Sequence, residues 1–153
     1  MNNQSHTSLK VNEVLDFWFG RSNSPEFGKI QKKWFEKDLA FDEEVRSGFL
    51  SQYELAAAEQ AVKNKFDREL LPVQRWFIYL PFEHSENLEH QQKSVELFSN
   101  LQGETDSELV INYAIRHLEV IERFGRFPHR NQILGRETTP EEAEFLKQPG
   151  SAF

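Results

Sequence analysis

The 153-residue chain carries 25 acidic and 18 basic side chains, and its net charge of −7 excludes a general nucleic-acid or membrane-surface binder. It has no cysteine, which excludes disulfides, thiolate zinc sites and a cysteine nucleophile. No apolar run approaches the length of a membrane span, and residues 1–10 (MNNQSHTSLK) lack the apolar core of a secretion signal, so we expect a cytoplasmic protein.

Helical periodicity dominates the first part of the chain. Apolar residues at three- and four-residue spacing from Val11 to Phe19 predict one helix. Trp34 anchors a short second helix, and Asp42 is placed to cap a longer one that runs to about Lys63. Residues 64–71 are expected to link this helix to the next.

The stretch 75–98 combines an aromatic run, a proline and a cluster of ionisable groups. We expect a short buried helix to begin at Pro72 and to end at Pro81, because proline suits the first turn and disrupts the interior. The apolar face of the following helix is marked by residues at helical spacing: Leu88, Val95 and Phe98. Glu83, His84 and Glu86 should then lie in or beside its first turn, where acids suit the helix dipole.

Two capping boxes are predicted further along the chain. Gly103 should end the helix after the central stretch, and the spacing of Thr105–Glu108 predicts the start of the next. Residues 109–121 are rich in apolar groups, so we expect that helix to be buried on most of its circumference until Gly125 ends it. The segment Thr139-Pro-Glu-Glu142 predicts a last short helix with proline at its first position.

These patterns predict an all-α protein, because no segment alternates apolar and polar residues over the length of a strand. Successive helices with short loops should pack as antiparallel hairpins. We expect a single helical domain over residues 11–147, with flexible tails at 1–10 and 148–153. The predicted core comprises aromatic and aliphatic residues of these helix faces: Leu15, Trp18, Phe19, Trp34, Phe49, Trp76, Phe77, Leu88, Ile115 and Phe127.

The second polar stretch, residues 123–136 (RFGRFPHRNQILGR), supplies positive charge in an acidic chain. Arginine forks suit carboxylates and phosphates, so the two stretches together form a candidate site for a small anionic ligand. The alternative is structural: Arg126 and Arg130 pair with Glu83 and Glu86 and lock two helical hairpins together. The candidate ligand-binding residues are eight polar residues from the two stretches: Glu83, His84, Glu86, Arg123, Arg126, His129, Arg130 and Asn131.

Proton transfer would fall to His84, Glu86 or His129, the candidate catalytic residues. A metal site is not predicted, because His84 and His90 are six residues apart and point away from each other. No cofactor is implied either, and Ser85 lacks the Gly-x-Ser-x-Gly pattern of a nucleophile.

Several uncommon motifs occur in order along the chain. They include Val14–Gly20 (VLDFWFG), Tyr79–Glu86 (YLPFEHSE), Phe124–Asn131 (FGRFPHRN) and Thr139–Glu142 (TPEE). From Val11 to Leu146 the chain resembles the bacterial domain-of-unknown-function family numbered 924. The resemblance implies an α-α superhelix like that of tetratricopeptide-repeat proteins, and no established activity.

The chain departs from this family in its middle. The resemblance implies another hairpin after the helix near Ala58, one that carries a Leu-Asp-Gln-Phe-Pro-Arg-Asn motif, and this motif is absent here. A helical stack that lacks one internal hairpin leaves two apolar helix faces without a packing partner, so we expect exposed apolar surface around Tyr53 and Ala57. We expect the protein to cover this surface by forming a homodimer, with exchange of the first helices between protomers as a plausible route.

Two functions are compatible with the sequence. The leading hypothesis is a polar pocket that binds a small anionic ligand, and we name no reaction. The alternative is a helical scaffold that grips a protein partner without catalysis.

Overall fold

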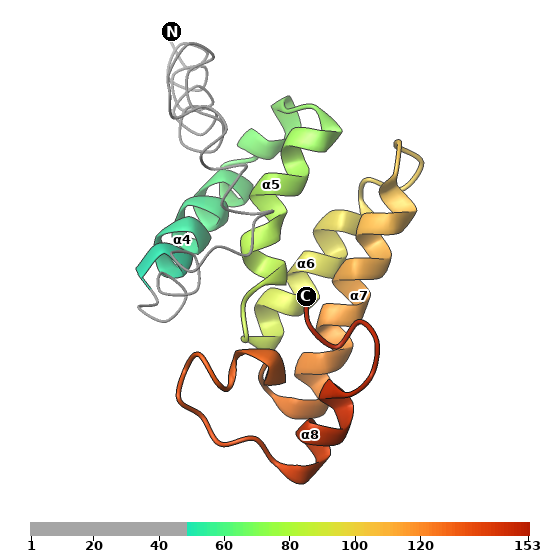
Figure 1. The fold of residues 1–153 in the computed structure, drawn as a ribbon. Coiled ribbons are helices and arrows are strands. Elements are labelled where there is room, and N and C mark those ends of the chain that lie inside the picture. Colours follow the sequence, from blue (N-terminus) through green and yellow to red (C-terminus); the bar gives the residue numbers. More distant parts are fainter. Residues whose placement is uncertain (1–48) are drawn as a thin grey trace, which may run out of the picture. The chain divides into compact units, whose positions relative to one another are not determined.

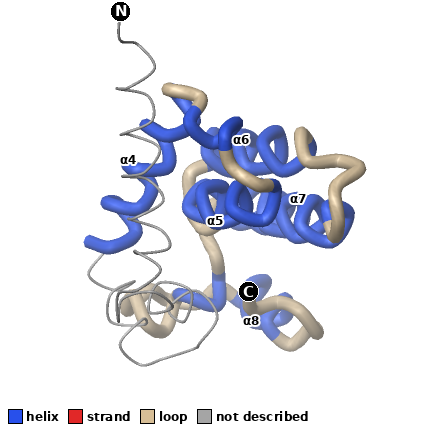
Figure 2. The backbone as a smooth tube through the Cα atoms, turned by 90° about the horizontal axis from the view of Figure 1, so that it is seen from above, coloured by secondary structure: helices blue, strands red, loops and turns tan. Residues whose placement is uncertain are grey.

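The computed structural model describes residues 49–153, with side chains from Leu55 onward. Its elements are α4 (Phe49–Lys63), the 3-10 helix η1 (Phe66–Glu69), α5 (Pro72–Glu83), α6 (Leu88–Ser99), α7 (Ser107–Phe124), the 3-10 helix η2 (Pro128–Arg130) and α8 (Pro140–Leu146) (Figure 1). Residues 49–153 contain no strand (Figure 2), which confirms the all-α class. The helices predicted before residue 49 lie outside the described residues, as do the side chains of Leu15, Trp18, Phe19, Trp34, Phe49 and Tyr53.

The chain divides into two compact units between Pro81 and Phe82. In the first unit, α4 ends at Lys63 as predicted. The expected linker instead contains η1, whose Phe66 and Asp67 are buried. The hydroxyl of Tyr79 on α5 donates a 2.6 Å hydrogen bond to Asp67 Oδ2, and burial raises the pKa of this tyrosine. A buried polar contact therefore fixes η1 against α5.

The second unit is built on α6 and α7, which lie side by side and run antiparallel (Figures 1 and 2). Asn87 caps α6, since its side chain accepts hydrogen bonds from the backbone N–H groups of Glu89 and His90. Gly125 ends α7 with φ +69°, a left-handed conformation that glycine adopts without strain. The hairpin prediction is confirmed for this pair of helices, whereas tetratricopeptide-like stacking and the single domain over 11–147 stay predictions.

Two helix boundaries differ from the predictions. Pro81 does not end α5, which continues to Glu83. A proline φ near −65° is compatible with a helix, so a proline close to the carboxyl end costs one hydrogen bond and a local clash without stopping the last turn. Glu83 therefore lies at the carboxyl end of α5 and not in the first turn of α6. At the start of α7, the predicted Thr105–Glu108 box does not form: the cap is Asp106 at φ +59°, with no side-chain hydrogen bond.

Two predicted core residues are exposed. Leu88 is 43% exposed at the first position of α6. Ile115 on α7 is 37% exposed, because the buried face of that helix is the narrow row Ala114, His117 and Ile121. The expectation that α7 is buried on most of its circumference is therefore wrong. Phe77 and Phe127 are buried as predicted, and Trp76 is half-buried.

Candidate functional site

Phe127 is the centre of the polar residues in the second unit. It follows the turn at Gly125, adopts an extended conformation before η2 and is fully buried. Its ring lies 4.7 Å from the Arg130 guanidinium carbon and 5.6 Å from the ring of His117. Val120 and Ile121 complete the buried cluster around it. Through Phe127, the loop after α7 thus places Arg130 of the arginine-rich stretch close to His117 of α7.

Glu86 forms the first ion pair of the site. Both of its oxygens accept hydrogen bonds from Arg136, at 2.8 and 2.9 Å, and Oε1 also accepts one from the backbone N–H of Phe127 at 2.8 Å. Burial opposes the ionisation of Glu86, but these hydrogen bonds outweigh it and lower its pKa. The carboxylate is therefore fixed as an acceptor that joins the loop before α6 to the loop after α7.

Glu142 forms the second ion pair. Arg126 donates to both of its oxygens, at 2.7 and 3.0 Å, and the backbone N–H of Thr139 donates to Oε2 in the predicted capping box at the start of α8. The hydrogen bonds from Arg126 are the main reason that the pKa of Glu142 falls to about 2. The buried amide of Asn131 links both pairs, since it donates to Glu142 and accepts from Arg136.

A third carboxylate, Glu83, lies beside a histidine that is equally buried. Glu83 Oε1 is 3.0 Å from His117 Nδ1, and both side chains are at most 4% exposed. The same nitrogen lies 2.7 Å from the carbonyl oxygen of Tyr113. The His117 ring also meets the ring of His84 edge-on, with centroids 5.5 Å apart. Glu83, the first residue of the segment 83–86 (EHSE segment), thus forms a buried histidine–carboxylate pair with His117 of α7.

Arg130 differs from the other arginines of the loop. Its Nη1 donates a 2.8 Å hydrogen bond to the backbone carbonyl of His84, a neutral acceptor. Among residues 55–153 no carboxylate forms an ion pair with it, although Glu86 is close enough to influence its ionisation. Burial is the main cause that lowers the pKa of this guanidinium.

The structure brings most predicted site residues together but not in the predicted pairs. Glu86 pairs with Arg136 rather than with Arg126 or Arg130. Arg123 lies apart from the rest, in an exposed ion pair with Glu141. His129 is 5.8 Å from Phe127, between ring centroids.

His90 lies 2.8 Å from Ser85, between Nδ1 and Oγ. No group of three metal-binding side chains occurs in residues 55–153.

Sequence reasoning missed three partners. Arg136 belongs to the quoted arginine-rich stretch but was not placed in the site. The capping-box pattern predicts only a helix cap at Glu142, which serves as both cap and ion-pair partner. His117 lies on the buried face of a helix, and a single histidine in an apolar pattern gives no signal of its partner.

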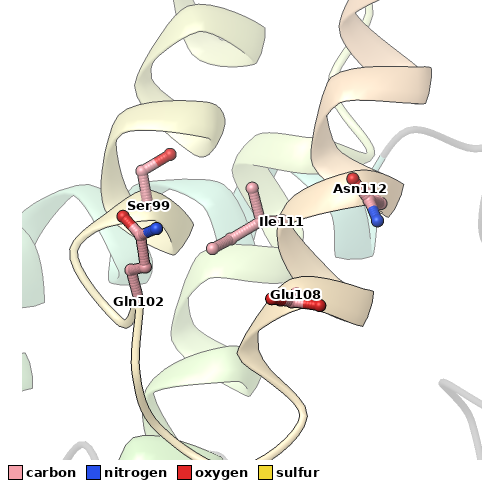
Figure 3. A pocket seen from close by; sticks show the side chains of 5 residues that line it. All are labelled: Ser99, Gln102, Glu108, Ile111 and Asn112. Carbon is pink, nitrogen blue, oxygen red and sulfur yellow. The ribbon is translucent and has the colours of Figure 1, made fainter.

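A separate cavity of about 340 Å³ lies between the end of α6 and the start of α7. Figure 3 shows its lining side chains: Ser99, Gln102, Glu108, Ile111 and Asn112. None of the predicted site residues lines it.

Comparison with known proteins places the chain in a family. Residues 52–150 match the family model described as bacterial protein of unknown function (DUF924). The chain belongs to this family. A solved structure similar to this chain, that of a protein of unknown function from Agrobacterium tumefaciens, has 28% sequence identity and a TM-score of 0.61, and the match covers 92% of this chain and 98% of that one. No functionally curated protein matches the chain. No helix in the described part of this DUF924 protein is long and apolar enough to cross a membrane.

Proposed function

We propose that this DUF924 protein binds a small anionic ligand, a carboxylate or a phosphate, with Arg130 as its main cationic contact. The supporting observation is the environment of Arg130, a half-buried cation whose Nη1 donates to the neutral carbonyl of His84. A guanidinium has five N–H donors in a planar fork, so most of its capacity remains for a planar or tetrahedral anion.

The neighbouring charges favour the same position. Arg126 and Arg136 are each neutralised by a bidentate carboxylate, so an anion would have to displace Glu142 or Glu86 to use them. Arg130 requires no such exchange. Burial is the main cause that lowers the pKa of Arg130 and the charge of Arg136 adds to it, so an anion bound by Arg130 would offset both effects.

His84 and His129 remain the candidates for proton transfer in this proposal, because the His84 carbonyl accepts from Arg130 and the ring of His129 lies 5.8 Å from that of Phe127, over which the Arg130 guanidinium lies. Glu86 is a weaker candidate, since both of its oxygens are occupied by Arg136 and the Phe127 N–H. Its role in the proposal is to hold the loop that carries Arg130.

Thermal unfolding in the presence of inorganic phosphate and of small mono- and dicarboxylates tests the proposal. At about a hundredfold excess over the dissociation constant, a bound anion raises the melting temperature by roughly 5 °C or more in a domain of this size. Arg130→Gln should abolish the shift relative to its own unliganded melting temperature, and Arg123→Gln should keep it. A full shift in Arg130→Gln, or no shift of the native protein with any of these anions, would overturn the proposal.

A helical scaffold that binds a protein partner or a second copy of the chain is the other candidate. It is favoured by exposed apolar side chains on α7, with Leu109 57% and Tyr113 44% exposed. Ala57 on α4, where we expected exposed surface, is half-buried. Light scattering at micromolar concentration distinguishes the candidates: a dimer that Tyr113→Glu dissociates supports the scaffold, and a monomer with an intact anion shift supports the pocket.

A further inference from the structure

The tautomer of His117 follows from its neighbours. Its Nδ1 lies 2.7 Å from the carbonyl oxygen of Tyr113, which can only accept a hydrogen bond, and 3.0 Å from Glu83 Oε1. Nδ1 must therefore carry a proton. In the neutral imidazole, the lone pair is then on Nε2.

Nε2 of His117 is buried and has no hydrogen-bond partner in the described part of the chain. A buried polar atom without a partner costs free energy, so such an atom is usually explained by strain or by a functional role. The pairing of Nδ1 with a carboxylate and a carbonyl is the arrangement that orients an imidazole whose other nitrogen accepts a proton or contacts a ligand.

The segment 150–153 covers this imidazole. The ring of Phe153 lies on the ring of His117, with centroids 3.8 Å apart and planes tilted by 34°. The Arg116 guanidinium lies 5.3 Å from the Phe153 ring and donates a 2.8 Å hydrogen bond to the carbonyl oxygen of Gly150. The hydroxyl of Ser151 donates to the carbonyl oxygen of Leu146. The segment expected to be a flexible tail is thus fastened over His117 by exposed or partly buried contacts.

We propose that His117 Nε2 is a proton acceptor for the ligand of this site and that residues 150–153 form a lid whose Phe153 ring must leave before a ligand reaches it. The lid is suited to local opening because few contacts hold it. Its hydrogen bond to Arg116 of α7 is solvent-exposed, and the ring stack on His117 involves a single aromatic side chain of the lid, Phe153. The inference adds a proton acceptor to the proposed anion site, yet its test needs no anion, so either proposal can fail alone.

Reaction of the full chain with diethyl pyrocarbonate measures access to the lone pair. Nε2 attacks a carbonyl carbon of the reagent and forms an N–C bond, monoethyl carbonate leaves, and the Nδ1 proton is released. Peptide mass spectrometry then gives the rate at His117, with His90 in the same molecule as an internal reference.

Phe153→Ala should raise the rate at His117 by about tenfold, since the loss of an aromatic stack of this kind corresponds to roughly that factor in the opening equilibrium. Gly150→Ala should raise it as well, because φ is +74° and a Cβ there would lie 2.5 Å from Arg116 Nη2. Phe145→Ala is the control for general loosening: Phe145 packs on Phe124 and, like Phe153, against the Val120, Ile121 and Phe127 cluster, but of the two rings only Phe153 stacks on His117, so Phe145→Ala should change the rate at His117 much less.

Nitrogen NMR of the native protein gives a second readout that does not depend on a variant. The account predicts that, in the neutral imidazole of His117, Nδ1 is the protonated nitrogen and Nε2 the pyridine-like one. A pyridine-like Nδ1, or a rate at His117 that Phe153→Ala leaves unchanged in a folded protein, would overturn the proposal. Equal acceleration by Phe145→Ala would do so too, because it would indicate general loosening rather than a lid.

Discussion

The bidentate pair of Glu86 and Arg136 should contribute more to stability than any exposed ion pair of the chain. In Arg136→Met, Glu86 keeps the Phe127 N–H but loses two charge-assisted hydrogen bonds of 2.8 and 2.9 Å, and Asn131 Oδ1 and the Phe127 carbonyl oxygen each lose one from Arg136. The two side chains are 23% and 27% exposed, which lies between the surface case of at most ~1 kcal/mol and the fully buried case of ~3–5 kcal/mol. We expect a loss of about 2–3 kcal/mol in the free energy of unfolding.

Arg123→Met is the control, because it removes the ion pair with Glu141, whose side chains are 49% and 64% exposed, and should cost less than about 0.5 kcal/mol. Urea denaturation followed by circular dichroism measures both variants. With a slope of about 2 kcal/mol per molar urea, the midpoint of Arg136→Met should fall by about 1 M. Adding Glu86→Gln to Arg136→Met should recover part of the loss, since the unpaired carboxylate is removed. Equal midpoints for the two single variants would refute the reasoning.

Three further variants test other parts of the second unit. The hydrogen bonds from Arg126 lower the pKa of Glu142 to about 2 from its ordinary value of 4.5, so its ion pair stabilises the fold fully above pH 4.5 and progressively less as the pH falls toward 2. The unfolding midpoint, measured as a function of pH, should show this loss in the native protein and much less of it in Glu142→Gln. Phe127→Ala should cost about 3–5 kcal/mol in denaturant unfolding, because the ring is fully buried at the centre of the cluster, and a cost below about 1 kcal/mol would contradict that position. Gly125→Ala should cost about 1–2 kcal/mol from backbone strain alone, since φ is +69° and a Cβ would meet nothing within 4 Å; an unchanged melting temperature would show that the helix ends differently.

Local sequence signals predicted the elements that depend on neighbouring residues. The capping box at Thr139 and the stop at Gly125 are set by interactions within a few positions, so short-range patterns were sufficient. The prediction that α5 ends at Pro81 was wrong for a related reason. The local rule states that proline destabilises a helix interior, but packing elsewhere in the fold determines whether the helix continues, and α5 continues to Glu83.

The pairing of charges was not predictable to the same degree. Charge complementarity indicated that the EHSE segment and the arginine-rich loop meet, and they do, through Arg136 and Arg130. Which arginine meets which glutamate depends on the path of the loop after Phe127, which connects residues 50 positions apart. His117 was missed for a related reason, because its partner Glu83 comes from a different helix.

The central claim is that Arg130 is the anion-binding cation of this site, and the side-chain resonances of the arginines test it most directly. Selective nitrogen labelling of arginine, followed by titration with inorganic phosphate, reports each Nε–Hε group separately. The account predicts a saturable shift at Arg130, with smaller effects at Arg136, and no change at Arg123. A shift confined to exposed arginines such as Arg123, or an Arg130 resonance that does not move up to millimolar phosphate and small carboxylates, would contradict it.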